Sequence, residues 1–469
     1  MLDEIRALMT AKRIWDEEII PGLSQYIRVP NVSPAFDDKW QENGHMERAV
    51  RLVADLCSKN PLSGLDVEIE RLGVRTPLIY MCAPGKRRET VLMYGHLDKQ
   101  PGLSGWRQGL SAFEPVREGD KLYGRGGADD GYAAFASLAA LRILQEQGVP
   151  YGRCVVLIEA GEESGSPDLE AYVERLSPHI GDPSLIICLD SGCGNYDQLW
   201  MTNSLRGVVG GVLRVEILEQ GVHSGDASGI VPSSFQILRQ LLDRVASSQT
   251  GTIYHEEFLA NIPHDRFEQA RAVAGALGTG VYDHFPFVPG ARPLTNNPFD
   301  LILNRTWRSA LSVTGVDGMP PIGNAGNVLR PYTSVKLSMR IPPTTDPVIA
   351  AAKLKSVLET NPPYGARVSF EADQLAPGWN APPFASWLEA AFEKASTAYF
   401  GKPPMFMGEG GSIPFMDMLS KRYPEAQFMV TGLLGPGSNA HGANESLDIP
   451  AGMKLTASVA SVIAANAAY

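Results

Sequence analysis

Three features are missing from this sequence, and each absence excludes a class of protein. No apolar run among the 469 residues is long enough to span a bilayer. The first twenty residues are charged throughout, without the apolar core of a signal peptide. A basic face is also absent, since 41 basic and 52 acidic residues give a formal net charge of −11. We therefore expect a cytoplasmic protein that binds neither membrane nor nucleic acid.

Cysteine is scarce as well. The five cysteines are an odd number, are scattered and form no CxxC pair, which is typical of reduced thiols rather than of disulfides. The hydrophobic content of 44% and charged content of 20% are those of an ordinary globular protein. The length predicts more than one domain.

The hydropathy pattern changes twice along the chain. Short apolar runs at 91–95, 154–159 and 185–189 predict buried strands, and residues 131–147 have the spacing of a helix. This alternation indicates an α/β sheet with helical crossovers. A strand (427–431), a helix (386–400) and an Ala-rich C-terminal helix resume the pattern late in the chain.

The middle of the chain differs because its strands alternate apolar and polar residues. Such strands are expected at 208–218, 334–343 and 366–375. Helices are expected at 233–246 and after Asp346, which with Pro347 forms an N-cap and first helical position. A polar insert covers about 250–320. We therefore expect an α/β catalytic domain (1–206 and 381–469) interrupted by an α+β domain (207–380).

Five short motifs rich in acids, histidine and glycine lie where strands are predicted to end or helices to begin. In an open α/β sheet, ligands bind at the carboxyl ends of the strands, so these motifs are expected to converge. They are GHLD (95–98), GRGGADDG (124–131), EAGEESGS (159–166), LDSG (189–192) and NAHGANE (439–445).

The side chains of these motifs suit a pair of metal ions. Three carboxylates and two imidazoles are available, and such carboxylates repel one another unless cations neutralise them. Two divalent ions about 3.5–4 Å apart, bridged by one carboxylate and one water, meet this requirement. The donors fit zinc, manganese or cobalt. The expected ligands are His96, Asp129, Glu163, Asp190 and His441.

Two further acids complete the predicted centre. Glu162 adjoins a ligand and can act as general base towards the water, while Asp98 can accept the second ring N–H of His96. Taken singly, each motif fits a structural role: a hydrogen-bonded histidine, a solvated helix start or a tight turn. GRGGADDG lacks the Lys-Ser/Thr of a phosphate-binding loop. The combination of all five motifs favours metal chemistry.

This ordered set resembles the dinuclear zinc peptidase family of carnosine and cytosolic non-specific dipeptidases, acetylornithine deacetylase and succinyl-diaminopimelate desuccinylase. The resemblance implies a mixed-sheet catalytic domain of zinc-exopeptidase type with an inserted lid and dimerisation domain. It assigns the same five ligands, with Asp129 bridging, and gives Glu162 and Asp98 the roles above.

Within that family, EESGS, SMRIPP and EGGSIP resemble the dipeptidase branch. The resemblance implies that Arg340 binds the substrate carboxylate and that His223 reaches the partner's site across a homodimer to polarise the scissile carbonyl. Two positions depart from the family: Gly131 replaces a usual lysine, and Gly408 a usual arginine. The other substrate-binding candidates are Gly410, Gly411, Ser412 and Asn327.

The expected function is hydrolysis of a dipeptide or similar small peptide. An N-acyl amino-acid deacylase is the alternative, because it needs the same metals and the same base. A non-catalytic relative is disfavoured, since none of the seven metal-centre positions is substituted.

Overall fold

A computed structural model describes residues 2–469. Its central sheet has six strands in the order β1-β2-β6-β3-β7-β17. The last four of these strands run parallel to one another, whereas β1 and β2 pair antiparallel. The predicted mixed sheet is thereby confirmed. The strands are β1 (Asp66–Glu70), β2 (Leu78–Ala83), β3 (Arg87–His96), β6 (Gly152–Glu159), β7 (Leu185–Cys188) and β17 (Gln427–Val430).

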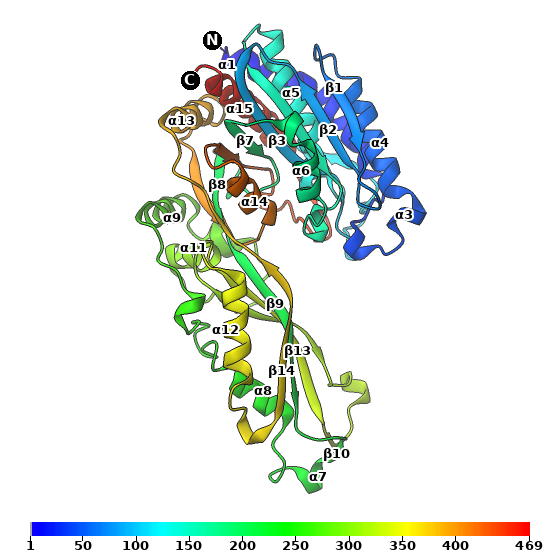
Figure 1. The fold of residues 1–469 in the computed structure, drawn as a ribbon, viewed down its shortest axis with the longest axis vertical. Coiled ribbons are helices and arrows are strands. Elements are labelled where there is room, and N and C mark those ends of the chain that lie inside the picture. Colours follow the sequence, from blue (N-terminus) through cyan, green and yellow to red (C-terminus); the bar gives the residue numbers. More distant parts are fainter. Residues whose placement is uncertain (1) are drawn as a thin grey trace.

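Helices cover both faces of this sheet (Figure 1). Val91 and Met93 of β3 pack with one group of helices, and Leu92 and Tyr94 pack with the other. Burial on both faces explains why β3 is a continuous apolar run rather than an alternating one. One group comprises α1 (Glu4–Ile14), α4 (His45–Ser58), α5 (Tyr132–Glu146), α13 (Ser386–Phe400) and α15 (Ile449–Asn466); the other comprises α6 (Leu169–Ile180) and α14 (Pro414–Arg422).

A second, antiparallel sheet has the order β11-β13-β9-β14, and it extends away from the first part as an arm (Figure 1). Helices α8 and α12 pack on one face of it. Asp346 caps α12 as predicted, accepting from the N–H groups of Val348 and Ile349. The elements are β9 (Gly207–Glu216), α8 (Ser234–Leu242), β11 (Ala310–Asp317), β13 (Tyr332–Ile341), α12 (Pro347–Glu359) and β14 (Arg367–Ala376).

The polar insert is more ordered than its composition suggests. It supplies β11 as a fourth strand, which the alternation pattern did not predict. Its helices α9 (His264–Leu277) and α11 (Pro298–Thr306) pack on a small sheet, β15-β8-β16. That sheet consists of β8 (Trp200–Leu205), β15 (Trp379–Asn380) and β16 (Met405–Glu409), and it stands where the chain enters and leaves the arm.

The tip of the arm holds the GVHSG motif. Residues Val222–His223 form a two-residue strand, β10, and Ser224–Ala227 form one helical turn, α7. Strand β10 pairs antiparallel with β12 (Val328–Leu329), about a hundred residues away in sequence, so no local pattern predicts it. No helix among the described residues is long and apolar enough to cross a membrane.

Candidate active site

The candidate ligands lie at one edge of the central sheet. His96 is the last residue of β3, and Asp190 follows β7 by two residues. Glu163 stands in a short turn after β6, and Asp129 in the turn that leads into α5. His441 comes from the loop between β17 and β18 (Ser446–Asp448). The carboxyl ends of parallel strands and the start of a helix therefore bring five distant segments together.

These ligands form two groups that share Asp129. In the first, His96 Nε2 lies 3.4 Å from Asp129 Oδ1 and 3.7 Å from Asp190 Oδ1. In the second, His441 Nε2 lies 3.0 Å from Asp129 Oδ2 and 3.4 Å from Glu163 Oε2. Each group can hold one ion, with the Asp129 carboxylate reaching both.

The donor atoms fit metal ions better than they fit one another. His96 Nε2, Asp129 Oδ2 and Glu163 Oε1 are buried without a well-oriented hydrogen-bond partner anywhere in residues 2–469. Buried polar atoms without partners are costly, and several in one place indicate a site that suits a cation. Imidazole nitrogen and carboxylate oxygen suit zinc, manganese or cobalt.

Charge repulsion in the cluster supports the same conclusion. Burial, followed by the Asp129 charge, raises the pKa of Glu163 to about 8. Burial and the Asp190 charge raise the pKa of Glu162 well above its usual value. Burial alone lowers the pKa of His441, but the contact with the Asp129 carboxylate outweighs it and the pKa rises to about 9. Protons and cations therefore compete for the same acceptors.

Asp98 contacts both the Glu162–Glu163 turn and the ring of His96. Its two carboxylate oxygens accept from the N–H groups of Glu162 and Glu163, each at 3.0 Å. His96 Nδ1 lies 3.2 Å from the Asp98 backbone oxygen and 3.5 Å from Oδ1. Nδ1 is thus directed at Asp98 and Nε2 at the other ligands, the orientation that a metal-binding imidazole requires.

Comparison with known proteins places this arrangement in a family. The model of peptidase family M20/M25/M40 matches residues 92–465, which include all five candidate ligands. The chain belongs to this family. Membership confirms the predicted relationship and the predicted reaction class, metal-dependent hydrolysis of a peptide bond.

Several curated relatives of the peptidase are dipeptidases. The cysteinylglycine-S-conjugate dipeptidase of Corynebacterium striatum is 26% identical over 76% of this chain and 77% of its own length. The Cys-Gly metallodipeptidase of Saccharomyces cerevisiae is 25% identical over 93% of both chains. The solved structure of human carnosine dipeptidase 1 superposes with a TM-score of 0.77 at 18% identity and 99% coverage of both chains, which shows a shared fold.

A buried pair that sequence reasoning missed holds the turn carrying Asp129. Glu445 accepts from Arg125 Nη1 at 2.8 Å and from the backbone N–H groups of Gly126, Ala128 and Asp129. Both side chains are almost fully buried. Glu445 ends the NAHGANE motif and Arg125 lies in GRGGADDG, so the motifs contained the signal, although the pairing spans 320 residues.

Gln100 was also missed. Its Nε2 donates to Glu163 Oε2 at 2.6 Å and so orients that carboxylate. Gln100 follows Asp98 by two residues, and this one segment therefore fixes both acids of the Glu162–Glu163 pair.

Gly131 and Gly408, the two departures from the family pattern, both lie where the surrounding structure leaves no room for a Cβ. A Cβ on Gly131 would lie 2.3 Å from the Tyr26 ring, and the buried Lys99 ammonium lies 3.9 Å from the centroid of that ring. A Cβ on Gly408 would lie 2.3 Å from Ser204 Oγ, while Arg305 pairs with the adjacent Glu409 at 2.9 Å.

The substrate-binding candidates near β16 form a connected corner. Arg340 Nη1 donates to Ser412 Oγ at 3.1 Å, and Ser412 Oγ donates to the backbone oxygen of Arg206 at 2.5 Å. Gly410 accepts through its backbone oxygen from Arg206 Nε at 3.2 Å, and Gly411 is exposed. No carboxylate within residues 2–469 pairs with Arg340, and its guanidinium is therefore free to bind an anion.

His223 and Asn327 lie together, but far from the metal ligands of their own chain. The Asn327 backbone oxygen accepts from Ser224 N–H at 2.9 Å, and His223 Nδ1 accepts from Gly225 N–H. Figure 1 shows β10 at the tip of the arm and β3 and β7 in the part at the other end. Within one chain, the structure does not bring these two candidates to the site.

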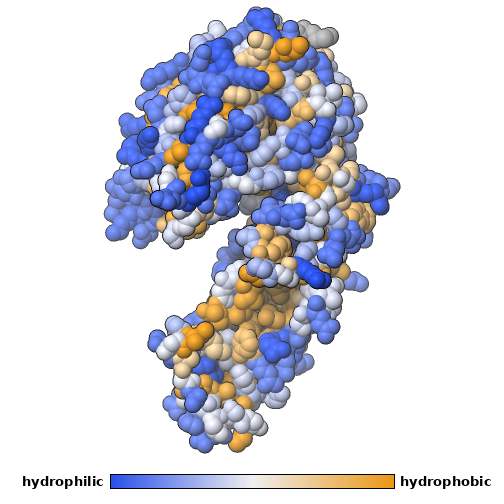
Figure 2. Space-filling model, turned by 180° about the vertical axis from the view of Figure 1, so that it is seen from behind, coloured by the Kyte–Doolittle hydropathy of each residue, from blue (hydrophilic) through white to orange (hydrophobic). Residues whose placement is uncertain are grey.

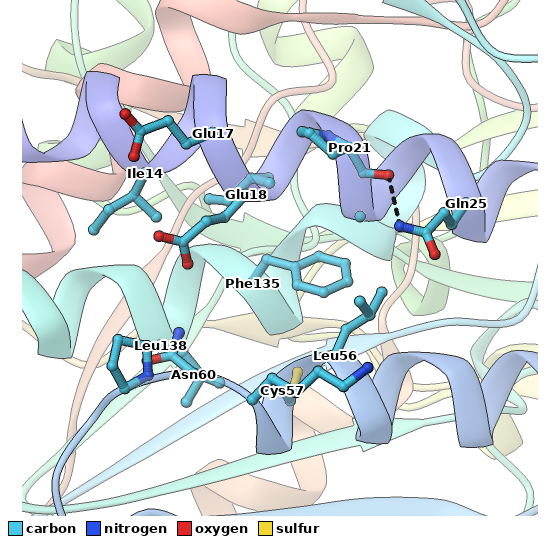
Figure 3. Close-up of a pocket in the computed structure, with 14 residues that line it drawn as sticks. Ile14, Glu17, Glu18, Pro21, Gln25, Leu56, Cys57, Asn60, Phe135 and Leu138 are labelled. Atoms are coloured by element: carbon cyan, nitrogen blue, oxygen red, sulfur yellow. Dashed lines mark hydrogen bonds between the residues drawn. The ribbon is translucent and has the colours of Figure 1, made fainter.

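A groove of about 510 Å³ between α2 (Ile20–Ile27), α4 and α5 is separate from this centre (Figure 3). None of the candidate ligands lines it. Its acids are already paired, Glu17 with Arg13 and Glu18 with Arg142. The groove therefore lacks the free acceptors of a second metal centre.

Proposed function

We propose that this peptidase is a homodimeric dipeptidase that uses two divalent metal ions per subunit, with zinc or manganese as the first candidates. Two ligand groups sharing Asp129, with Glu162 beside them, are the observation that carries the proposal. The relatives named for Cys-Gly substrates support a small dipeptide with a free amine. The five free cysteines support a reducing, cytoplasmic location.

The chemistry divides between the ions and this chain's own groups. When bound, two divalent ions act as Lewis acids on the scissile carbonyl and on the attacking water. Glu162 accepts the proton of that water and returns it to the leaving amine. Burial and the Asp190 charge raise the pKa of Glu162 above its usual value, which makes it a stronger proton acceptor than an exposed glutamate. Asp98 holds the Glu162 backbone in place.

Arg340 and Ser412 are proposed to hold the C-terminal carboxylate of the substrate, with Gly410 and Gly411 shaping the loop. The guanidinium has no carboxylate partner within residues 2–469 and is partly buried, so a substrate carboxylate would meet an uncompensated charge. A planar guanidinium binds a carboxylate in bidentate fashion.

In this proposal, residues 1–206 and 381–469 form the catalytic domain. Residues 207–380, which include the arm, form a lid and dimerisation domain. His223 and Asn327 at its tip would then complete the site of the partner, where His223 polarises the scissile carbonyl. Edge strand β11 exposes Val313 and Val316, and Figure 2 shows apolar surface along the arm. Such a surface suits a protein partner.

A hydrolysis panel tests the proposed function. Metal-free protein is reconstituted with manganese or zinc and offered Cys-Gly, Ala-Gly and N-acetyl-Ala. We expect turnover of the free-amine dipeptides only with metal present. Faster hydrolysis of N-acetyl-Ala would instead identify an N-acyl amino-acid deacylase.

A further inference from the structure

The corner around residues 408–412 holds more positive charge than one substrate carboxylate neutralises. Three guanidinium groups surround this loop: Arg340 at Ser412, Arg206 at Gly410 and Arg305 at Glu409. Glu409 is the one carboxylate paired with them in residues 2–469. Three positive charges against one negative charge leave a surplus of two.

No acid among the described residues neutralises the charge of Arg206. Its guanidinium is buried and donates to the backbone oxygens of Gly410, Asn304 and Arg308. Hydrogen bonds to neutral carbonyls orient the group but leave its charge. Burial first, and then the charges of Arg340 and Arg305, lower its pKa to about 10.

The Arg305–Glu409 pair adjoins the metal ligands. A Cβ on Gly192 would lie 2.5 Å from Glu409 Oε1, and Gly192 follows the ligand Asp190 by two residues. Glu409 Oε1 is buried without a hydrogen-bond partner among the described residues. Arg305 keeps 36% of its side chain exposed, so it can reach a ligand in front of the pair. The corner around residues 408–412 therefore extends to the turn that carries Asp190.

We propose that this corner selects dipeptides whose C-terminal residue is aspartate or glutamate, an inference that rests on the proposed function. Arg340 binds the main-chain carboxylate, and Arg305 binds the side-chain carboxylate. Arg206 is a positioning residue that holds the loop and adds its charge. Two substrate carboxylates then match the surplus of two charges.

Product binding provides a test that does not depend on turnover. Calorimetry of the manganese-loaded protein compares L-glutamate with its neutral isostere, L-glutamine. We expect glutamate to bind about tenfold more tightly, the effect of one charge-assisted hydrogen bond. Equal affinities would overturn the inference.

Two variants distinguish direct binding by Arg305 from the effect of the net positive charge around the loop. Arg305→Gln reduces the surplus to one, whereas Arg305→Gln combined with Glu409→Gln leaves it at two and still removes the contact. The glutamate-to-glutamine affinity ratio should approach one in both variants. A ratio kept in the double variant would refute the role of Arg305. Arg308→Gln is the matched control, because its guanidinium pairs with Asp300 and not with the loop, and it should retain the ratio.

Hydrolysis separates this inference from the proposed function. We expect Ala-Glu to exceed Ala-Gln in kcat/KM by about tenfold, mainly through KM. Hydrolysis of Ala-Gln and Ala-Gly at the same efficiency as Ala-Glu would contradict the specificity alone. Failure to hydrolyse any dipeptide would contradict the proposed function. The calorimetric comparison of glutamate with glutamine would still show whether the loop binds a side-chain carboxylate.

Discussion

At the scale of single residues, Arg340 offers a clear separation of binding from chemistry. Arg340→Ala should raise KM for free-acid dipeptides by about tenfold or more, since a charge-assisted hydrogen bond is lost, and should barely change KM for their C-terminal amides. Steady-state kinetics on matched acid and amide pairs measure this. Equal losses on both substrates would indicate that Arg340 only supports the corner.

The pH dependence of stability follows from two ligands. Burial and the Asp129 charge raise the pKa of Glu163 from 4.5 to about 8. Burial lowers the pKa of His441, but the contact with the Asp129 carboxylate outweighs it and raises this pKa from 6.5 to about 9. Groups with raised pKa values bind protons more tightly in the folded state, so their contribution is fully present below the unfolded pKa and is lost as pH rises through the folded pKa.

Metal-free protein should therefore lose thermal stability between about pH 4.5, the unfolded pKa of Glu163, and about pH 9, the folded pKa of His441. Manganese should stabilise it more at pH 8.5 than at pH 6, because the ligands must be deprotonated to bind. Melting temperatures with chelator and with manganese check both trends. A chelated protein that gains stability over this range would contradict the assignment.

Site residues could be predicted from the sequence where a local pattern marked them. His96, Asp190 and Glu163 each follow an apolar strand, so their place at the sheet edge was predictable. Gln100 and Glu445 were not recognised, because their role depends on contacts with segments far away in the chain.

At the scale of elements, the turn 124–131 depends on one buried acid. Glu445→Gln removes the charge that faces buried Arg125, and breaking such a pair costs about 3–5 kcal/mol. We expect a lower melting temperature and about tenfold to hundredfold weaker manganese binding, since Asp129 loses its support. Thermal unfolding and metal titration measure these effects.

Glu118→Gln is the matched control, because its partner Arg107 is exposed to solvent and such pairs add little to stability. Full metal affinity in Glu445→Gln would show that the turn holds Asp129 without this acid.

The elements themselves were largely predictable where periodicity was strong. The apolar strands of the central sheet, the alternating strands β9, β13 and β14, and the Asp346 cap all appear near their expected positions. Strand β11 was missed because it lies at the edge of its sheet and is mostly exposed, so no apolar pattern marks it.

At the scale of the whole molecule, activity should require two chains. His223→Ala and Glu162→Gln are each expected to be nearly inactive, yet their mixture should recover about a quarter of wild-type activity, since half of randomly exchanged dimers are mixed and each has one intact site of two. Subunit exchange is verified by mass-labelled chains. No recovery after proven exchange would place His223 outside the partner's site.

The central claim is that two ions share Asp129 and that Glu162 moves the proton. Glu162→Gln, assayed for bound manganese and for kcat on the same sample, tests this most directly. We predict two ions per subunit in both proteins and a kcat about a hundredfold to ten-thousandfold lower in the variant, the usual contribution of a general base. Undiminished kcat with two ions bound, or a single ion in the active wild-type protein, would contradict the account.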